Sequence, residues 1–72
     1  MIDFMSTESR QFGRNMKRIR KEKGITQGDI SRALKLARSF ISNIENGKAN
    51  PTLATVTRIA KVLQVPSSEL LK

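Results

Sequence analysis

The sequence predicts an all-α domain of five short helices packed around one core. Apolar residues recur at three- and four-residue spacings in successive segments, which is the periodicity of amphipathic helices. Gly, Asn and Pro stand between those segments, and no segment shows the alternating polarity of a half-buried strand. At 72 residues the chain is near the lower limit for a self-sufficient core. We assign residues 1–7 to a flexible N-terminal arm and residues 8–72 to the domain.

The first helix is expected to begin at Ser6 or Thr7 and to run to about Lys23. Gly24 ends it, because glycine adopts the left-handed conformation of a helix C-terminus without strain. Its inward stripe has i, i+4 and i+7 spacing and consists of Phe12, Met16 and Ile19.

Two shorter helices follow, over about residues 27–34 and 38–46. Thr26 is placed to cap the first of them, and Asp29 stands three residues later in a capping-box-like arrangement. Gly47 suits a left-handed end to the second. The expected inward positions are Ile30, Ala33 and Leu34 in the first helix and Ile41 and Ile44 in the second.

A fourth helix is predicted after a loop in which Pro51 keeps Asn50 out of the helical region. Thr52 can cap this helix, which runs to about Gln64. Its apolar positions are Leu53, Val56, Ile59, Ala60 and Leu63. Residues 65–67 interrupt the pattern, and a final turn holds Glu69, Leu70 and Leu71.

The second and third helices, with the tight turn between them, form a helix-turn-helix. The outward side of the third helix carries small polar and cationic side chains: Arg38, Ser39, Ser42 and Asn43. This arrangement is typical of helices that read the major groove of DNA.

The charge of the chain points to the same partner. The formal net charge is +8, and seven of the fourteen cations lie between Arg10 and Lys23. Such an excess favours polyanions, nucleic acid before anionic membrane. Arg14 and Lys17 are candidates for phosphate contact within this run, and a merely solvated charged face is the alternative.

The absence of histidine and cysteine removes the commonest general base, the commonest zinc ligand and the thiolate nucleophile. We therefore expect no enzyme activity, no cofactor and no metal. No run of eighteen apolar residues exists to span a membrane, and residues 1–5 are too short and too acidic for a signal peptide. A soluble cytoplasmic protein without a membrane partner is expected.

From about Phe12 to Leu71 the chain resembles the Cro and lambda-repressor type of DNA-binding domain, the XRE-like helix-turn-helix family. The resemblance is carried by three segments in order: RKEKGITQ at 20–27, FISNIENG at 40–47 and NPTL at 50–53. It implies a compact five-helix lambda-repressor-like fold of bacterial or phage origin. The run 38–53 is similar to the controller proteins of restriction–modification systems, which are small dimeric regulators.

The resemblance also implies roles for individual residues. The positions facing the groove are Arg38, Ser39, Ser42 and Asn43. Besides Arg14 and Lys17, the residues expected to contact the DNA backbone are Gln27, Asn46, Lys48 and Asn50. Glu45 matches an acidic position that pairs with an arginine of the first helix, here Arg20. Lys35 stands where a turn glycine is usual, and Ala37 stands where a capping Ser or Asp is usual.

Several of these positions keep alternatives open. Arg38 can present two donors to guanine O6 and N7, or it can clamp a phosphate. Asn43 can bond adenine or contact phosphate, and Gln27 can contact phosphate or brace the next helix. Phe40 is expected in the core, with contact to a thymine methyl as the alternative.

The expected function is that of a sequence-specific transcriptional regulator, binding double-stranded DNA as a homodimer on a palindromic operator. A restriction–modification controller is the narrowest interpretation, with RNA polymerase as a further partner. A phage-type repressor, an antitoxin-like regulator and a less specific nucleic-acid or protein-interaction module are the alternatives. The dimer surface is predicted at the C-terminal end, where late apolar residues could instead close the protomer core: Val62, Val65, Leu70 and Leu71.

Overall fold

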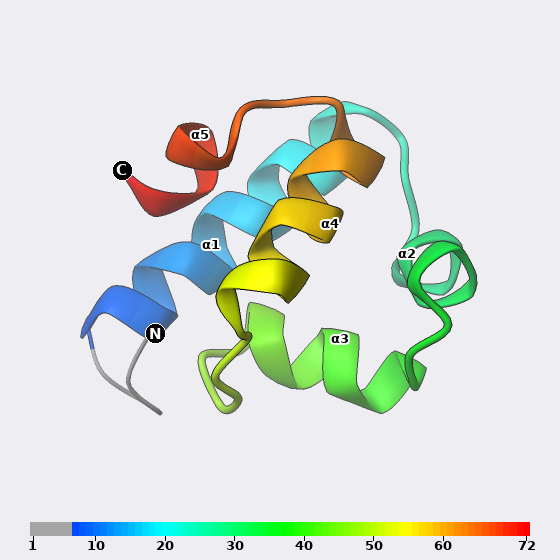
Figure 1. The fold of residues 1–72 in the computed structure, drawn as a ribbon, viewed down its shortest axis with the longest axis horizontal. Helices are drawn as coiled ribbons and strands as arrows, with labels where there is room; N and C mark the ends of the chain where they lie inside the picture. The colour runs from blue at the N-terminus through cyan, green and yellow to red at the C-terminus, as the bar shows by residue number, and fades with distance from the viewer. Residues whose placement is uncertain (1–6) are drawn as a thin grey trace.

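The computed structural model describes residues 7–72, which form five helices joined by short loops (Figure 1). These helices are α1 (Thr7–Glu22), α2 (Gln27–Leu34), α3 (Arg38–Glu45), α4 (Leu53–Leu63) and α5 (Ser67–Leu71). The all-α prediction is confirmed, and α2 begins and ends at the predicted residues. The arm predicted for residues 1–7 lies outside the described residues except for Thr7, which is already helical.

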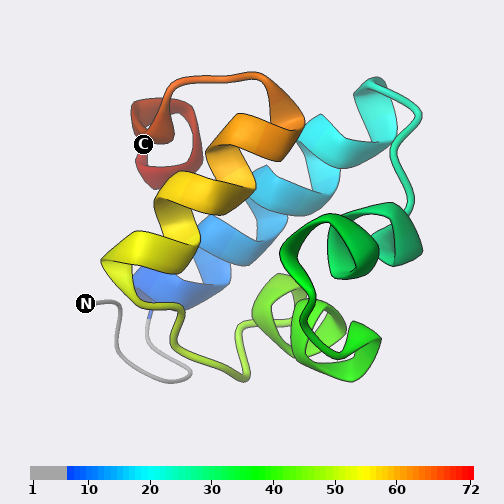
Figure 2. The same ribbon diagram turned by 45° about the vertical axis from the view of Figure 1, so that its right-hand side comes forward.

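The helices pack so that α3 lies along one edge of the molecule. α1 packs against α3 and α5, while α2 packs against α3 and α4. Figures 1 and 2 show α4 in front of α1, with α2 and α3 adjacent to each other. One side of α3 therefore meets α1 and α2, and its other side is open to solvent.

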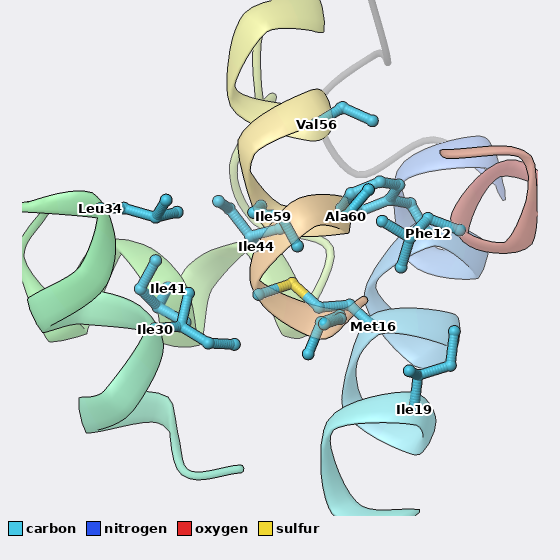
Figure 3. Close-up of a cluster of buried hydrophobic side chains, with 12 residues drawn as sticks. Phe12, Met16, Ile19, Ile30, Leu34, Ile41, Ile44, Val56, Ile59 and Ala60 are labelled. Carbon is cyan, nitrogen blue, oxygen red and sulfur yellow. The ribbon is translucent and has the colours of Figure 1, made fainter. Parts of the chain in front are cut away.

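One hydrophobic core joins all five helices. Figure 3 shows side chains from α1, α2, α3 and α4 converging on a common interior. The predicted stripe of α1 is buried there. The complete core consists of Phe12, Met16, Ile19, Ile30, Leu34, Ile41, Ile44, Val56, Ile59, Ala60, Leu63 and Leu70. Phe40 packs half-buried against this core, as expected.

Two predicted inward positions are wrong. Ala33 is exposed, and Leu53 keeps 70% of its surface accessible. Ala33 lies about a quarter turn beyond the direction of Ile30 and Leu34, so the short helix turns its methyl group away from the core. Leu53 is the first residue of α4, and no other element of the described residues covers its side chain. Periodicity gives the direction of a side chain but does not say whether another element covers it.

The start of α2 is fixed by a reciprocal capping box. The Asp29 backbone N–H donates to the Thr26 hydroxyl at 3.0 Å, and the Thr26 backbone N–H donates to the Asp29 carboxylate at 2.9 Å. The backbone hydrogen bond from Thr26 is the main reason that the pKa of Asp29 lies below its ordinary value. This pair explains why the predicted start of α2 was accurate.

The turn between α2 and α3 departs from the usual pattern in the two expected ways. Lys35 has φ 57° and ψ 42°, which is the left-handed conformation. Ala37 precedes α3 without a side-chain cap. A left-handed residue with a Cβ costs roughly 1–2 kcal/mol, so the turn holds strain at one position.

Lys35→Gly is expected to stabilise the protein by about 0.5–1 kcal/mol, because relief of this strain outweighs the added entropy of the unfolded chain. For a domain of this size, the melting temperature should rise by about 2–8 °C. Lys35→Ala is the control, since it removes the same charge but keeps a Cβ at the left-handed position. Thermal unfolding followed by circular dichroism checks the prediction, and equal shifts in both variants would contradict it.

None of the helices in the described part of the chain is long and apolar enough to cross a membrane.

Candidate nucleic-acid interface

The outward side of α3 carries four polar side chains in two adjacent rows. Arg38 and Ser42 form one i, i+4 row, and Ser39 and Asn43 form the other. Three of the four are exposed, and Ser42 is half-buried. Among the described residues, the Arg38 guanidinium and the Asn43 amide engage no side-chain or backbone partner. Their donors are therefore available to an external partner.

The end of α3 is locked by backbone hydrogen bonds. Gly47 has φ 73°, its N–H donates to Ile44 O at 3.1 Å, and the Lys48 N–H donates to Asn43 O at 2.8 Å. This Schellman arrangement satisfies the last carbonyls of the helix. It leaves Asn46 and Lys48 exposed directly after α3.

Asn50, which is expected to contact the DNA backbone, is more deeply buried than such a contact requires. The residue is half-buried, and its carboxamide oxygen is buried without a hydrogen-bond partner among the described residues. It directly precedes the buried Pro51. Asn50 is therefore less accessible to a phosphate than Asn46 or Lys48.

A buried carboxylate anchors α3 to the rest of the domain. Arg20 Nε and Nη2 donate to the two Glu45 oxygens at 2.6 and 3.1 Å, with side chains 11% and 1% exposed. Gln27 Nε2 donates to Glu45 Oε1 at 3.0 Å, and Arg20 Nη1 donates to Ile25 O at 3.1 Å. The ion pair expected for Arg20 and Glu45 is thus present, and it links α1, α2 and α3.

Gln27 takes the bracing role in this structure. It is half-buried at the first position of α2, and its amide is turned to Glu45. Contact between Gln27 and a phosphate remains a prediction. The bracing hydrogen bond fixes α2 and α3 relative to each other at the side facing α1.

Sequence reasoning missed Gly13, which sets the distance between α1 and α3. A Cβ at this position would lie 2.4 Å from Glu45 O and 2.6 Å from Ile44 O. These are backbone atoms, so only a hydrogen fits between the helices. The available signal was a glycine inside a long helix, which costs about 1 kcal/mol relative to alanine unless packing requires it.

Arg58 is a second residue that the sequence did not single out. Its Nη2 donates to Leu34 O at 2.8 Å, which satisfies a carbonyl at the C-terminus of α2. This bond ties α4 to α2 immediately before the turn that leads into α3. A cation at a helix C-terminus is also favoured by the helix dipole.

The predicted dimer surface is only partly open. Leu71 is 52% exposed, and Val62 and Val65 are half-buried against the core. Leu70 has no exposed surface, so its assignment to a dimer interface is wrong. It closes the protomer core because α5 is held on α1, where Asn15 Nδ2 donates to Leu70 O and Lys72 O at 3.0 Å each.

The two remaining candidates for contact with the DNA backbone lie on α1. Arg14 and Lys17 are both exposed, and no ion pair of the described residues involves either side chain. They lie on the side of α1 opposite the core. The structure thus brings the α3 residues together on one surface, and the two cations lie on the exposed side of a different helix.

Comparison with known proteins agrees with this geometry. Residues 16–70 match the family described as Helix-turn-helix. Control protein C.MunI of Mycoplasma sp is 38% identical over 61 residues, which cover 83% of this chain and 82% of that protein.

Two solved structures are similar over most of their length. The restriction-modification controller protein C.AhdI from Aeromonas hydrophila has a TM-score of 0.85 at 26% identity, covering 90% of this chain and 98% of that one. SinR, the master regulator for biofilm formation solved in complex with DNA, has a TM-score of 0.76 at 32% identity, covering 85% and 98%. With the family match over most of the chain and the helix pair formed by α2 and α3, this protein belongs to the helix-turn-helix family of the XRE and lambda-repressor type.

Proposed function

We propose that the chain is a sequence-specific transcriptional regulator that inserts α3 into the major groove of double-stranded DNA. The observation that carries this proposal is the outward surface of α3, whose donors are free while the helix itself is anchored by Glu45. A fixed helix with unengaged polar groups can present them to base edges without first rearranging. The likeness to SinR, which was solved with DNA, supports the same arrangement.

Within this function, the chain acts as a homodimer that controls a restriction–modification system. The likeness to C.MunI and C.AhdI supports the narrower assignment. The exposed Leu71, with the half-buried Val62 and Val65, supplies apolar surface for a second copy. A two-fold dimer places its recognition helices about 34 Å apart, which requires an approximately palindromic operator.

Selection of bound sequences from random DNA tests the proposal. Wild-type protein should recover palindromes whose half-site centres are separated by about one helical turn. Arg38→Ala should lose preference at one position of each half-site, because a bidentate contact to guanine gives about 1–3 kcal/mol of discrimination. Recovery of unrelated sequences by the wild-type protein would refute specific recognition.

Lys48→Ala is the matched control for Arg38→Ala. Its exposed ammonium follows α3 and carries no base-reading geometry, so its loss should weaken all sequences alike. The slope of the logarithm of affinity against the logarithm of salt concentration should become shallower by about one unit. If Arg38→Ala instead weakens every sequence equally, Arg38 clamps a phosphate and does not read a base.

A further inference from the structure

Asn46 and Gly47 form an Asn-Gly step at the end of α3. Among the four asparagines of the chain, only Asn46 is followed by glycine. The backbone nitrogen after an asparagine can attack the side-chain amide, and a glycine leaves that nitrogen unhindered because it has no Cβ. Asn46 is exposed, so water reaches its carboxamide. The sequence and the exposure therefore permit deamidation wherever the backbone can adopt the reactive geometry.

Deamidation at this step needs no reagent besides water. The Gly47 nitrogen gives up its proton to solvent and attacks Asn46 Cγ, which forms an N–Cγ bond. The Cγ–Nδ2 bond then breaks, and the departing nitrogen takes up a proton and leaves as ammonia. Water opens the resulting succinimide ring at Cγ to give an aspartate, or at the backbone carbonyl to give an isoaspartate. Overall one water enters and one ammonia leaves, without oxidation or reduction.

The folded end of α3 holds this step in an unreactive conformation. Asn46 has φ −91° and ψ 4°. Ring closure requires the Gly47 nitrogen to eclipse Asn46 Cβ, and that position lies about a third of a turn away. The Gly47 N–H donates to Ile44 O at 3.1 Å, and Gly47 is buried where a Cβ would lie 2.9 Å from Arg10 Cγ. The attack therefore requires α3 to open at its last turn.

This opening involves only a small part of the molecule. α3 has eight residues, and the loop that follows it lies at one edge of the molecule (Figure 1). Opening of a helix end costs much less free energy than global unfolding, so open forms are populated in a native protein. DNA on the outer side of α3 would oppose the opening, because the contacts predicted for Asn43, Asn46 and Lys48 hold the last turn in place. The reactive form is then confined to unbound protein.

The products of the reaction would oppose DNA binding through charge and through the backbone. A carboxylate at position 46 lacks the N–H donors of the amide and brings a negative charge close to the DNA phosphates. It also stands at the C-terminus of α3, where the helix dipole disfavours a negative charge. The isoaspartate adds a backbone carbon between positions 46 and 47, so the Schellman hydrogen bonds lose their spacing.

We propose that Asn46 is a deamidation site that the folded end of α3 restrains and that bound DNA protects. Unbound copies of the protein lose operator affinity with time, while bound copies keep it. The loss of operator affinity rests on the proposed function, whereas the modification itself does not.

Incubation of the whole chain in mildly alkaline buffer tests the proposal. Three samples are compared: protein alone, protein saturated with the selected operator, and protein in denaturing urea. The tryptic peptide of residues 39–48 contains both Asn43 and Asn46, so its fragment masses compare the two sites in one molecule. Asn46 should be modified well before Asn43, because the β-branched Ile44 hinders the attacking nitrogen. Asn46 should react about tenfold or more faster in urea than in the folded protein, and most slowly with the operator.

Two variants connect the modification to DNA binding. Asn46→Asp carries the charge of the product from the start and should bind the operator about fivefold more weakly than fresh wild-type protein. Asn46→Gln is the matched control, because its longer side chain would have to close a less favoured six-membered ring. Whatever its initial value, the operator affinity of Asn46→Gln should stay constant during an incubation in which wild-type affinity falls.

Equal rates at Asn43 and Asn46 would overturn the assignment of the site, as would an Asn46 that stays unmodified in the folded protein after complete reaction in urea. Equal rates with and without the operator would overturn protection by DNA. Tight operator binding by Asn46→Asp would overturn the effect on affinity. Failure of the proposed function would be distinct, because fresh wild-type protein would then prefer no selected sequence while the modification could still be followed by mass.

Discussion

Glu45→Ala is expected to lower the free energy of unfolding by about 3–5 kcal/mol, because it leaves the Arg20 guanidinium buried without its counter-charge. The total free energy of unfolding of a domain of this size is roughly 4–11 kcal/mol. The substitution should therefore remove a large part of its stability. DNA affinity should fall as well, since α3 loses its links to α1 and α2. Urea unfolding and operator titration measure the two effects.

Glu22→Ala is the control for this prediction. Glu22 also pairs with an arginine, but the pair is 3.4 Å long and its side chains are 48% and 62% exposed. Exposed pairs of this kind contribute less than about 1 kcal/mol. Glu45→Gln should fall between the two, because its amide oxygen still accepts one hydrogen bond. A stability of Glu45→Ala equal to that of Glu22→Ala would mean that the buried pair does not hold the helices together.

Gly13→Ala is expected to destabilise the protein by about 1–3 kcal/mol, although alanine is the better helix former. The added Cβ would lie 2.4 Å from Glu45 O, and ordinary contact begins at 3.4 Å. α1 and α3 would have to separate by about 1 Å. That shift would also stretch the hydrogen bonds from Arg20 to Glu45, so operator affinity should decrease together with the melting temperature.

Gly28→Ala tests whether the effect belongs to the site or to glycine in general. The tightest contact of a Cβ on Gly28 would be the end of the flexible Arg32 side chain at 3.2 Å, and the Thr26 hydroxyl would lie at an ordinary 3.7 Å. This substitution should be neutral or stabilising by up to about 1 kcal/mol, because it improves helix propensity. Stabilisation of both variants would show that α1 and α3 can separate without loss.

Local sequence signals predicted most of the helix boundaries. α2 was placed correctly because Thr26 and Asp29 form a capping box whose partners are three residues apart. The interactions that decide this boundary lie within a few residues of chain, where spacing alone is informative. Lys35, which is left-handed in the structure, was singled out by the family resemblance instead.

Features that depend on distant segments were predicted poorly. Gly13 matters because of carbonyls more than thirty residues later, and nothing near it in sequence reveals that approach. Leu70 was assigned to a dimer surface because its burial depends on α5 folding back onto α1. The pair of Arg20 and Glu45 was expected from the family resemblance, since no local pattern joins residues on two different helices.

The separation of roles around α3 has a consequence for how such regulators diversify. The residues that hold this helix in place, Gly13, Arg20, Gln27 and Glu45, lie on the side turned to α1 and α2. The candidate base-reading side chains point the other way, and most of them are exposed. Substitutions on the outer side can therefore retarget the protein to a new operator while the scaffold stays intact. Duplicated copies of one gene can acquire separate regulatory targets through a handful of surface changes.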